Sequence, residues 1–194
     1  NLSPRQLYEP DLVAQVRAVL EETGFDPGGL ILEITEGALL QGVEETKRKL
    51  ADLKQLGVRL AIDDFGNGST TLAYLGEFPV DILKIDRSFI RGMSDNPEGR
   101  ILVQAILDLA RALKLDTVAE GIELKEQRTE LLTSGCASGQ GFLFAEPVTP
   151  ERIAGLLDGG ELSVRSDSYV VGLGELSRGQ TPHGQGAAEG RSGT

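Results

Sequence analysis

Short apolar runs that end on acidic residues recur along this chain, and they constrain its fold more than any other feature. One run ends at Glu33, a second at Asp63 and Asp64, and a third at Glu120. A carboxylate at the end of a buried strand is costly unless a metal ion or a catalytic task holds it there. The carboxyl ends of successive parallel strands meet at one face of a β/α barrel, where active sites lie. The pattern therefore predicts a metal-dependent hydrolase that acts on a phosphate ester.

Amphipathic segments with helical periodicity separate the apolar runs, so that strands and helices alternate along the chain. The expected helices cover residues 12–20, 43–56, 69–75, 101–113, 124–132 and the residues after Thr149. The expected strands cover residues 29–34, 58–62, 80–85, 115–119 and 137–144. Alternation at this short spacing predicts parallel strands joined by right-handed crossovers.

The number of strand–helix units predicts a barrel that is not complete. Counting residues 1–3 as the end of a further strand gives about six βα units, whereas a complete TIM-type barrel has eight. We therefore expect an α/β fold, an incomplete TIM-type barrel without its first units, over residues 1–160. Residues 161–194 are expected to form an extension that becomes a disordered tail rich in Gly and Ser, because few apolar residues remain there to bury.

Composition narrows the class of protein. A net charge of −11 disfavours general affinity for DNA or for anionic membranes. The single cysteine, Cys136, cannot form an internal disulfide, which suits a reducing compartment, and we expect a cytoplasmic domain. No apolar run is long enough to span a bilayer. Because the chain begins at Asn1 rather than at a methionine, we expect the remainder of a longer protein, whose preceding part can carry a membrane anchor.

The adjacent acids Asp63 and Asp64, followed by two glycines, are the strongest local signal for a metal site. Neighbouring strand residues face opposite ways, so both carboxylates can reach one site only if the strand has ended at Asp63. Carboxylate ligands suit Mg²⁺ or Mn²⁺, and a residue that bridges two ions suits two-metal phosphoester cleavage. The alternative is a capped turn in which Asp64 binds its own backbone, and a lone Asp-Asp pair fits that turn more often.

Lys84 and Asp86 share one face of their expected strand. A lysine near the top of a barrel can hold a phosphate oxygen or orient an attacking water, whereas the alternative is a buried Lys–Asp ion pair. Glu120 follows an apolar strand and is a candidate general base or metal ligand. The alternative, an acid favoured by the amino end of a helix, suits Glu123 better.

Three further polar positions bear on the expected site. Glu33 and Glu36 are three positions apart, so that along a strand their side chains would point to opposite faces. Only one of them is therefore expected to bind a metal. Gln140 lies within the last expected strand, where a buried amide needs partners. Cys136 is expected to be a small packed residue, and His183 lies in the expected tail. Without an ordered histidine, a Ser-His-Asp hydrolase and a histidine-rich zinc site are both disfavoured.

Six stretches, in this order and spacing, together resemble the EAL domain, a barrel that hydrolyses the bacterial second messenger cyclic di-GMP to linear pGpG. They are residues 1–7, 32–36, 62–66, 84–86, 119–123 and 135–147. The resemblance implies metal ligands at Asn1, Glu33, Asp63, Asp64 and Glu120. It also implies that Lys84 contacts the attacking water or the phosphate. Glu120 would be a metal ligand or the general base, and Gln140 would lie near the water. Glu36 resembles the glutamate that anchors the loop after Asp64 and links metal occupancy and dimerisation to activity.

The resemblance further implies a reaction and a set of partners. A hydroxide activated by two Mg²⁺ or Mn²⁺ ions would attack one phosphodiester of cyclic di-GMP in line. The intact protein would form a homodimer and would carry sensory or diguanylate cyclase modules upstream. Its net charge of −11 separately predicts that it does not bind DNA. The alternative to the enzyme is a non-catalytic cyclic di-GMP receptor or protein-interaction module. A barrel of the enolase type would also gather acids and a lysine, but it does not explain Gln140.

Two departures from the family pattern matter. The Glu-Ala-Leu segment that names the family, with its metal-binding glutamate and the arginine that follows, is not found in the chain and belongs upstream of Asn1. For that reason we expect this chain alone to be inactive or nearly so. The loop over residues 67–72 reads Asn-Gly-Ser-Thr-Thr-Leu where the family commonly has Thr-Gly-Tyr-Ser-Ser-Leu, which removes a tyrosine.

Overall fold

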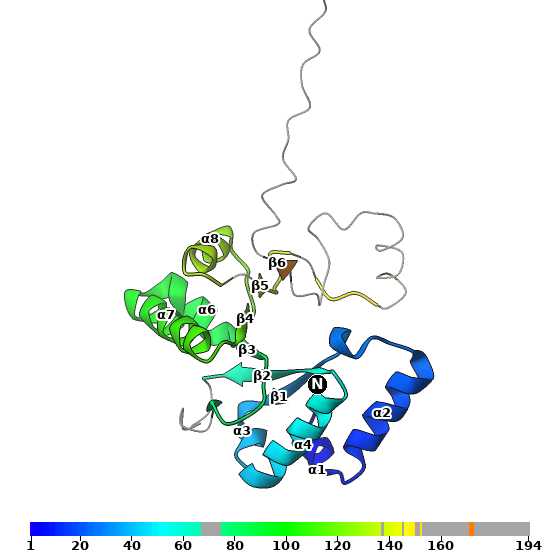
Figure 1. The fold of residues 1–194 in the computed structure, drawn as a ribbon. Helices are drawn as coiled ribbons and strands as arrows, with labels where there is room; N and C mark the ends of the chain where they lie inside the picture. The colour runs from blue at the N-terminus through cyan, green and yellow to red at the C-terminus, as the bar shows by residue number, and fades with distance from the viewer. Residues whose placement is uncertain (67–74, 137, 145, 150–151, 153–170, 173–194) are drawn as a thin grey trace, which may run out of the picture.

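A computed structural model of the chain describes residues 1–66, 75–136, 138–144, 146–149, 152 and 171–172 (Figure 1). Several expected segments lie outside these residues. They are the loop 67–72, the expected helix 69–75 except for its last residue, most of the helix after Thr149, and the extension 161–194 with His183, apart from Val171–Gly172. Among the described helices, none is both long enough and apolar enough to cross a membrane.

Six strands form one sheet in the order in which they occur along the chain. They are β1 (Ile31–Thr35), β2 (Arg59–Phe65), β3 (Ile82–Ile85), β4 (Asp116–Ala119), β5 (Ser138–Gly139) and β6 (Val171–Gly172). The first five are parallel to their neighbours, and β6 pairs with β5 in the antiparallel direction. Leu2 forms a parallel bridge with Ile34, which places the first residues of the chain beside β1 as expected. The α/β class with a parallel sheet is thus confirmed, and the described sheet is an open part of a barrel.

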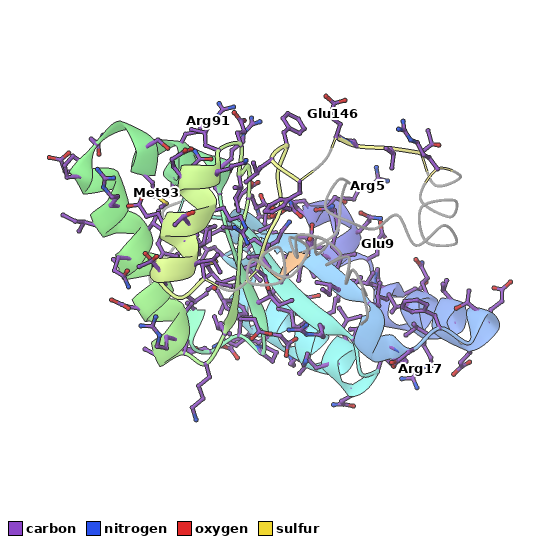
Figure 2. The ribbon with its side chains drawn as sticks, turned by 90° about the horizontal axis from the view of Figure 1, so that it is seen from above. Arg5, Glu9, Arg17, Arg91, Met93 and Glu146 are labelled. Carbon is purple, nitrogen blue, oxygen red and sulfur yellow. The ribbon has the colours of Figure 1, made fainter. Side chains whose placement is uncertain are left out.

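Helices connect the parallel strands and flank the sheet. They are α1 (Pro4–Tyr8), α2 (Leu12–Thr23), α3 (Glu36–Leu39), α4 (Val43–Gln55), α6 (Arg87–Asp95), α7 (Pro97–Ala112) and α8 (Lys125–Thr133), with the 3-10 turn η1 (Pro27–Gly29). Figure 1 shows α1 to α4 toward one end of the sheet and α6 to α8 toward the other, and Figure 2 shows the same division from above.

Capping signals in the sequence explain where two of the helices begin. At α1, the Ser3 side chain accepts a hydrogen bond from Gln6 N, and the Gln6 side chain accepts one from Ser3 N. This reciprocal pair satisfies two amides that the helix itself leaves free. At α7, Asn96 Oδ1 accepts a hydrogen bond of 2.7 Å from Gly99 N, and Pro97 occupies the first helical position. The residues directly before and at the start of each helix therefore determine where it begins.

The two faces of the sheet pack against different groups of residues, because alternate strand residues point to opposite faces. Ile62 and Leu83 belong to the main core. Ala61, Ile82 and Val118 form a second and smaller cluster on the other face. Since side chains alternate along a strand, the residues two positions further on share this second face. The second face thus leads directly to the acidic ends of the strands.

Two of the sequence expectations about elements are wrong. The segment 87–95 was not expected to be helical, yet it forms α6 immediately after β3. The last parallel strand was expected over 137–144, but β5 covers only Ser138–Gly139, and the apolar residues after it form a turn. An apolar run without clear alternation cannot by itself distinguish a strand from a buried turn.

Candidate functional site

Lys84 lies at the centre of the charged side chains on the second face of the sheet. Its Nζ is 2.9 Å from Glu33 Oε1, 2.8 Å from Asp63 Oδ1 and 2.7 Å from Glu120 Oε1. These acids come from β1, from β2 and from the end of β4, so the buried lysine joins three carboxylates across the sheet. The alternative of a Lys84–Asp86 pair is not what the described residues show, because Asp86 Oδ1 instead accepts a hydrogen bond from Ser88 N at the start of α6.

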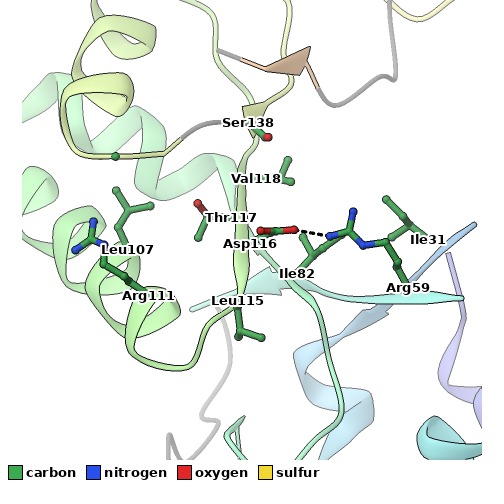
Figure 3. A pocket seen from close by; sticks show the side chains of 11 residues that line it. Ile31, Arg59, Ile82, Leu107, Arg111, Leu115, Asp116, Thr117, Val118 and Ser138 are labelled. Atoms are coloured by element: carbon green, nitrogen blue, oxygen red, sulfur yellow. Dashed lines mark hydrogen bonds and ion pairs between the residues drawn. The ribbon is translucent and has the colours of Figure 1, made fainter. Parts of the chain in front are cut away.

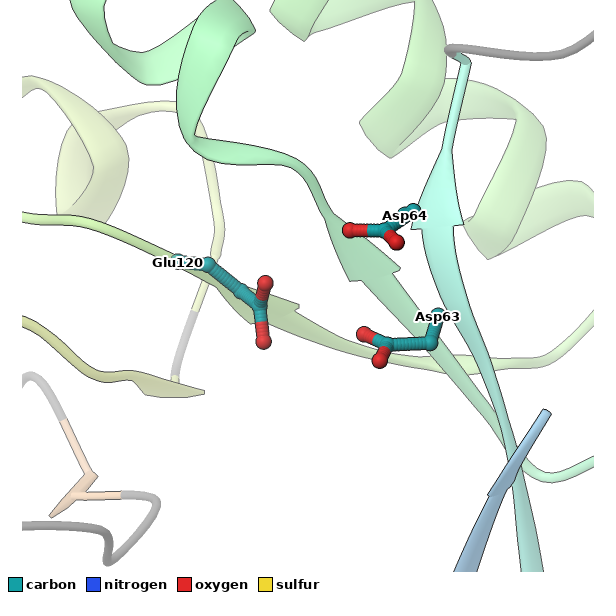
Figure 4. Close-up of side chains that lie close together, drawn as sticks. All are labelled: Asp63, Asp64 and Glu120. Carbon is teal, nitrogen blue, oxygen red and sulfur yellow. The ribbon is translucent and has the colours of Figure 1, made fainter. Parts of the chain in front are cut away.

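A β-bulge brings both acids of the Asp63–Asp64 pair to one site. The expectation that the strand ends at Asp63 is wrong, because β2 continues through Phe65. The pairing with β3 shifts here, so that Asp63 and Asp64 together stand opposite Lys84. Asp64 adopts a left-handed backbone with φ of 54°, which aspartate tolerates better than most residues. The bulge interrupts the alternation of side chains, and both carboxylates turn toward Glu120 (Figure 4).

The resulting acidic cluster fits a divalent cation. Asp63, Asp64 and Glu120 each offer a carboxylate oxygen, and these oxygens lie within 4.8 Å of one another. Asp63 Oδ1 is buried, and among the described residues the contact found for it is the ion pair with Lys84. A buried oxygen of this kind, in a set of ligands made only of carboxylates, suits a hard cation such as Mg²⁺ or Mn²⁺.

The electrostatics of the cluster explain why it needs positive charge. Burial raises the pKa of Glu120, and Lys84 opposes that shift. Burial also raises the pKa of Asp64, and the neighbouring carboxylates of Asp63 and Asp86 raise it further. Burial lowers the pKa of Lys84, but contacts with its three acids outweigh burial, and the net pKa is raised. The acids are therefore crowded enough that one lysine does not offset their mutual repulsion.

Gln140 makes the contact with the site that its position suggested. Its Nε2 donates a hydrogen bond of 2.8 Å to Glu120 Oε1, and its backbone N donates to Ala119 O. The residue follows β5 instead of lying within a longer strand. Gly141, the next residue, lies so close to Ile122 that an added methyl group would stand 2.2 Å from Ile122 N. This close approach holds Gln140 beside Glu120.

Glu36 and Asn1 have different surroundings in the structure. Glu36 is buried as the first residue of α3, and its Oε2 accepts a hydrogen bond of 2.9 Å from Gly66 N. It therefore contacts the chain just after Asp64, where an anchor of that loop must be. Asn1 is exposed beside the end of β1, and within the described residues no hydrogen bond joins it to the acidic cluster.

A pocket of about 510 Å³ lies at the opposite end of the strands from the acids (Figure 3). It is lined by the first residues of β2, β3 and β4, among them Arg59 and Asp116, which form an ion pair. On the other side of β4 the lining includes Leu107 and Arg111 of α7. This pocket contains none of the acids of the candidate metal site.

Sequence reasoning missed α6 and the residues through which it contacts the site. Phe89 of α6 lies against Gly66, and Gln127 of α8 hydrogen-bonds to the backbone of Ile90. One available signal was Asp86, since an aspartate directly after a strand is a good helix N-cap. From the sequence, Asp86 was considered only for the strand face that it shares with Lys84, in the site or in an ion pair.

Comparison with known proteins shows which family the sequence and the fold resemble. The sequence profile of the EAL domain matches residues 1–147. An uncharacterised protein of Synechocystis sp. is 40% identical over 157 residues, which cover 81% of this chain and 23% of that protein. This chain spans about a fifth of the length of the first curated relatives that it matches.

Two solved structures show the same similarity in three dimensions. The PaMucR phosphodiesterase in complex with c-di-GMP is 39% identical, with a TM-score of 0.75 over 79% of this chain and 62% of the other. The manganese and c-di-GMP complex of Klebsiella pneumoniae BlrP1 at pH 9.0 is 31% identical, with a TM-score of 0.69 over 74% of this chain and 37% of the other.

Proposed function

Since this chain belongs to the EAL domain family, we propose that it carries most of the active site of a metal-dependent phosphodiesterase that hydrolyses cyclic di-GMP to pGpG. The observation that carries this proposal is the convergence of Asp63, Asp64 and Glu120, whose carboxylate oxygens lie within 4.8 Å of one another. The similarity to a phosphodiesterase in complex with c-di-GMP, and to a manganese complex of the same ligand, supports the choice of substrate and cation.

The acidic residues of the cluster and Lys84 would have different functions in the reaction. Asp63, Asp64 and Glu120 would hold Mg²⁺ or Mn²⁺, with Glu33 and Asn1 as further ligands from the edge of β1. A bound divalent cation lowers the pKa of a bound water and neutralises phosphate charge. Lys84, which stays protonated among its acids, would bind a phosphate oxygen or orient the attacking water.

Two other residues would keep the acids in place. Gln140 donates a hydrogen bond to Glu120 and so fixes the direction of that carboxylate. Glu36 accepts a hydrogen bond from Gly66 and so holds the chain that leaves Asp64. Through this contact Glu36 would link cation binding to the loop that follows. Homodimer assembly, upstream sensory or diguanylate cyclase modules and a cytoplasmic location stay predictions.

The decisive experiment measures the conversion of cyclic di-GMP to pGpG by chromatography, with Mg²⁺ or Mn²⁺. It uses this chain and a form extended at its amino end by the Glu-Ala-Leu strand of the family. We expect turnover by the extended form and little by the chain alone. Glu120→Gln should lower the rate of the extended form by at least about a hundredfold, because a ligand or general base is lost. Glu126→Gln, which makes the same change on an exposed residue of α8, should leave the rate unchanged.

The alternative function is separated by the same experiment. If the extended form binds the dinucleotide but leaves it intact, the domain is a receptor or an interaction module and not an enzyme. If it neither binds nor hydrolyses the dinucleotide with either cation, the proposed function is wrong.

A further inference from the structure

The loops that leave the two acidic strand ends both press a glycine against the first turn of α6. A methyl group added at Gly66, two residues after Asp64, would stand 2.5 Å from Phe89 Cε2 and 2.6 Å from Phe89 Cζ. A methyl group added at Gly121, directly after Glu120, would stand 2.5 Å from Arg87 Cβ. Contacts this close leave no room for movement of α6 toward either loop. The first turn of α6 therefore separates the two acid-bearing loops.

Gly66 is held from two sides. Its backbone has φ of 99°, and its N donates a hydrogen bond of 2.9 Å to the buried carboxylate of Glu36. The ring of Phe89 also packs against Gly66 and is itself partly buried in the main core. Removing the far end of that ring would remove one of these two contacts. The bulge that carries Asp63 and Asp64 immediately precedes this contact.

The buried side-chain amide of Gln127 connects α6 to the loop that follows Glu120. Its Oε1 accepts hydrogen bonds from Glu123 N at 2.9 Å and Leu124 N at 3.0 Å. Its Nε2 donates to Ile90 O at 3.3 Å and to Ser94 Oγ at 3.2 Å. The chain after Glu120 and the helix α6 are thus tied together. Because α6 cannot move independently of the Glu120 loop, the contact of α6 with Gly66 sets where the other acids stand.

We infer that Phe89 is a positioning residue for the metal site, which fixes the separation of the Asp63–Asp64 bulge from Glu120 by packing against Gly66. This inference rests on the proposed function, since it assumes that these acids bind a divalent cation. Residues that orient metal ligands typically change metal affinity by roughly 10- to 100-fold when they are replaced. Phe89 would act in this way through van der Waals contact instead of through a hydrogen bond.

Two substitutions of Phe89 by side chains of similar volume but different length test whether contact with Gly66 is what matters. Phe89→Leu keeps an apolar side chain but is too short to touch Gly66, whereas Phe89→Met is long and flexible enough to restore the contact. The probe is Mn²⁺ alone, and the signal of free Mn²⁺ in electron paramagnetic resonance reports how much is bound by the full chain. We expect Phe89→Leu to weaken Mn²⁺ binding by about tenfold and Phe89→Met by less than about threefold.

A core variant controls for a general loss of stability. Leu107→Ala empties a buried position of α7 beside the pocket at the opposite end of the strands, and it should lower stability without changing Mn²⁺ affinity. If the unaltered chain binds Mn²⁺ and Phe89→Leu binds it equally well, the role of Phe89 is refuted and the proposed function stands. If Leu107→Ala weakens binding as much as Phe89→Leu does, the effect is one of stability and the role of Phe89 is refuted. If the unaltered chain binds no Mn²⁺, the titration is repeated on the form extended by the Glu-Ala-Leu strand; if that form binds none either, the proposed metal site is wrong, and the inference fails with it.

Discussion

The ammonium group of Lys84 allows the acids of the site to lie close together, because it offsets part of their mutual repulsion. It forms ion pairs with one oxygen each of Glu33, Asp63 and Glu120, and it is itself buried. A buried charge that loses its partner costs much more than an exposed one, because water cannot replace the lost interaction. At this scale the site consists of one cation surrounded by carboxylates that repel each other.

Replacing Lys84 by methionine should therefore destabilise the protein most when no metal is present. We expect Lys84→Met to lower the free energy of unfolding in EDTA by about 3 kcal/mol, the lower end of the range for breaking a buried pair, since its acids are partly exposed. Saturating Mn²⁺ should recover part of that loss, because the ion supplies positive charge to the same oxygens. Urea unfolding with and without Mn²⁺ measures both effects.

The pair Lys54–Asp81, at 2.7 Å, gives the matched control for that experiment. Lys54→Met also removes an ion pair, but away from the acidic cluster. Its effect on unfolding should be the same in EDTA and in Mn²⁺. An equal response of the two variants to Mn²⁺ would contradict the role assigned to Lys84.

Gly66 is the residue at which backbone conformation and packing both exclude a side chain. Gly66→Ala should destabilise the protein by at least about 1–2 kcal/mol, because an L-residue is strained at φ of 99° and its methyl group would meet the Phe89 ring. Gly37→Ala in α3 is the control, since nothing lies within 4 Å of an added methyl group there. That variant should be neutral or slightly stabilising. Chemical denaturation of the two variants decides between these outcomes.

Several elements were not found from the sequence, among them α1, α3 and β6, but α6 is the one of these that most affects the site. The parallel strands and the longer helices follow from apolar periodicity, and the acids at the ends of β1, β2 and β4 were found for the same reason. Residues 87–95 do carry apolar residues at helical spacing, namely Phe89, Ile90 and Met93, but the segment is short and contains Gly92. Their helical state depends on the Asp86 cap and on packing against α7 and α8, which sequence periodicity does not report.

The bulge in β2 was missed for a related reason. Strict alternation of side chains predicts that Asp63 and Asp64 face apart unless the strand has ended, and the sequence analysis applied that rule. The structure instead inserts an extra residue into the strand, and the left-handed conformation of Asp64 makes this possible. Bulges depend on how the neighbouring strand pairs, and that information is not local to the sequence.

The contact between α6 and α7 should tolerate a side chain on one helix and not on the other. A methyl group added at Gly99 would stand 2.1 Å from Gly92 O, whereas one added at Gly92 meets no atom closer than 4.0 Å. Gly99→Ala should therefore cost about 3 kcal/mol or more, since backbone atoms cannot move aside cheaply. Gly92→Ala should cost less than about 0.5 kcal/mol or stabilise the helix. Thermal unfolding of both variants tests this asymmetry, and equal midpoints would argue against the packing described.

For the molecule as a whole, cation binding should be visible as global stability. A ligand that binds only the folded state stabilises it by about 2.7 kcal/mol at a hundred times its dissociation constant. Titration with Mn²⁺ should therefore raise the unfolding midpoint continuously, and EDTA should return it to the starting value. The combined variant Asp63→Asn and Glu120→Gln should show no such rise, because two of the three clustered acids are neutralised. A rise that persists in that variant would place the ion elsewhere.

The ammonium group of Lys84 also bears on how the protein is assembled in a cell. Because it serves as an internal counter-ion for the acids, we expect the chain to fold even where divalent ions are scarce. Under the proposed function, metal loading would then follow folding as a separate and reversible step. A pool of folded, metal-free protein would respond to ion supply without the synthesis of new polypeptide.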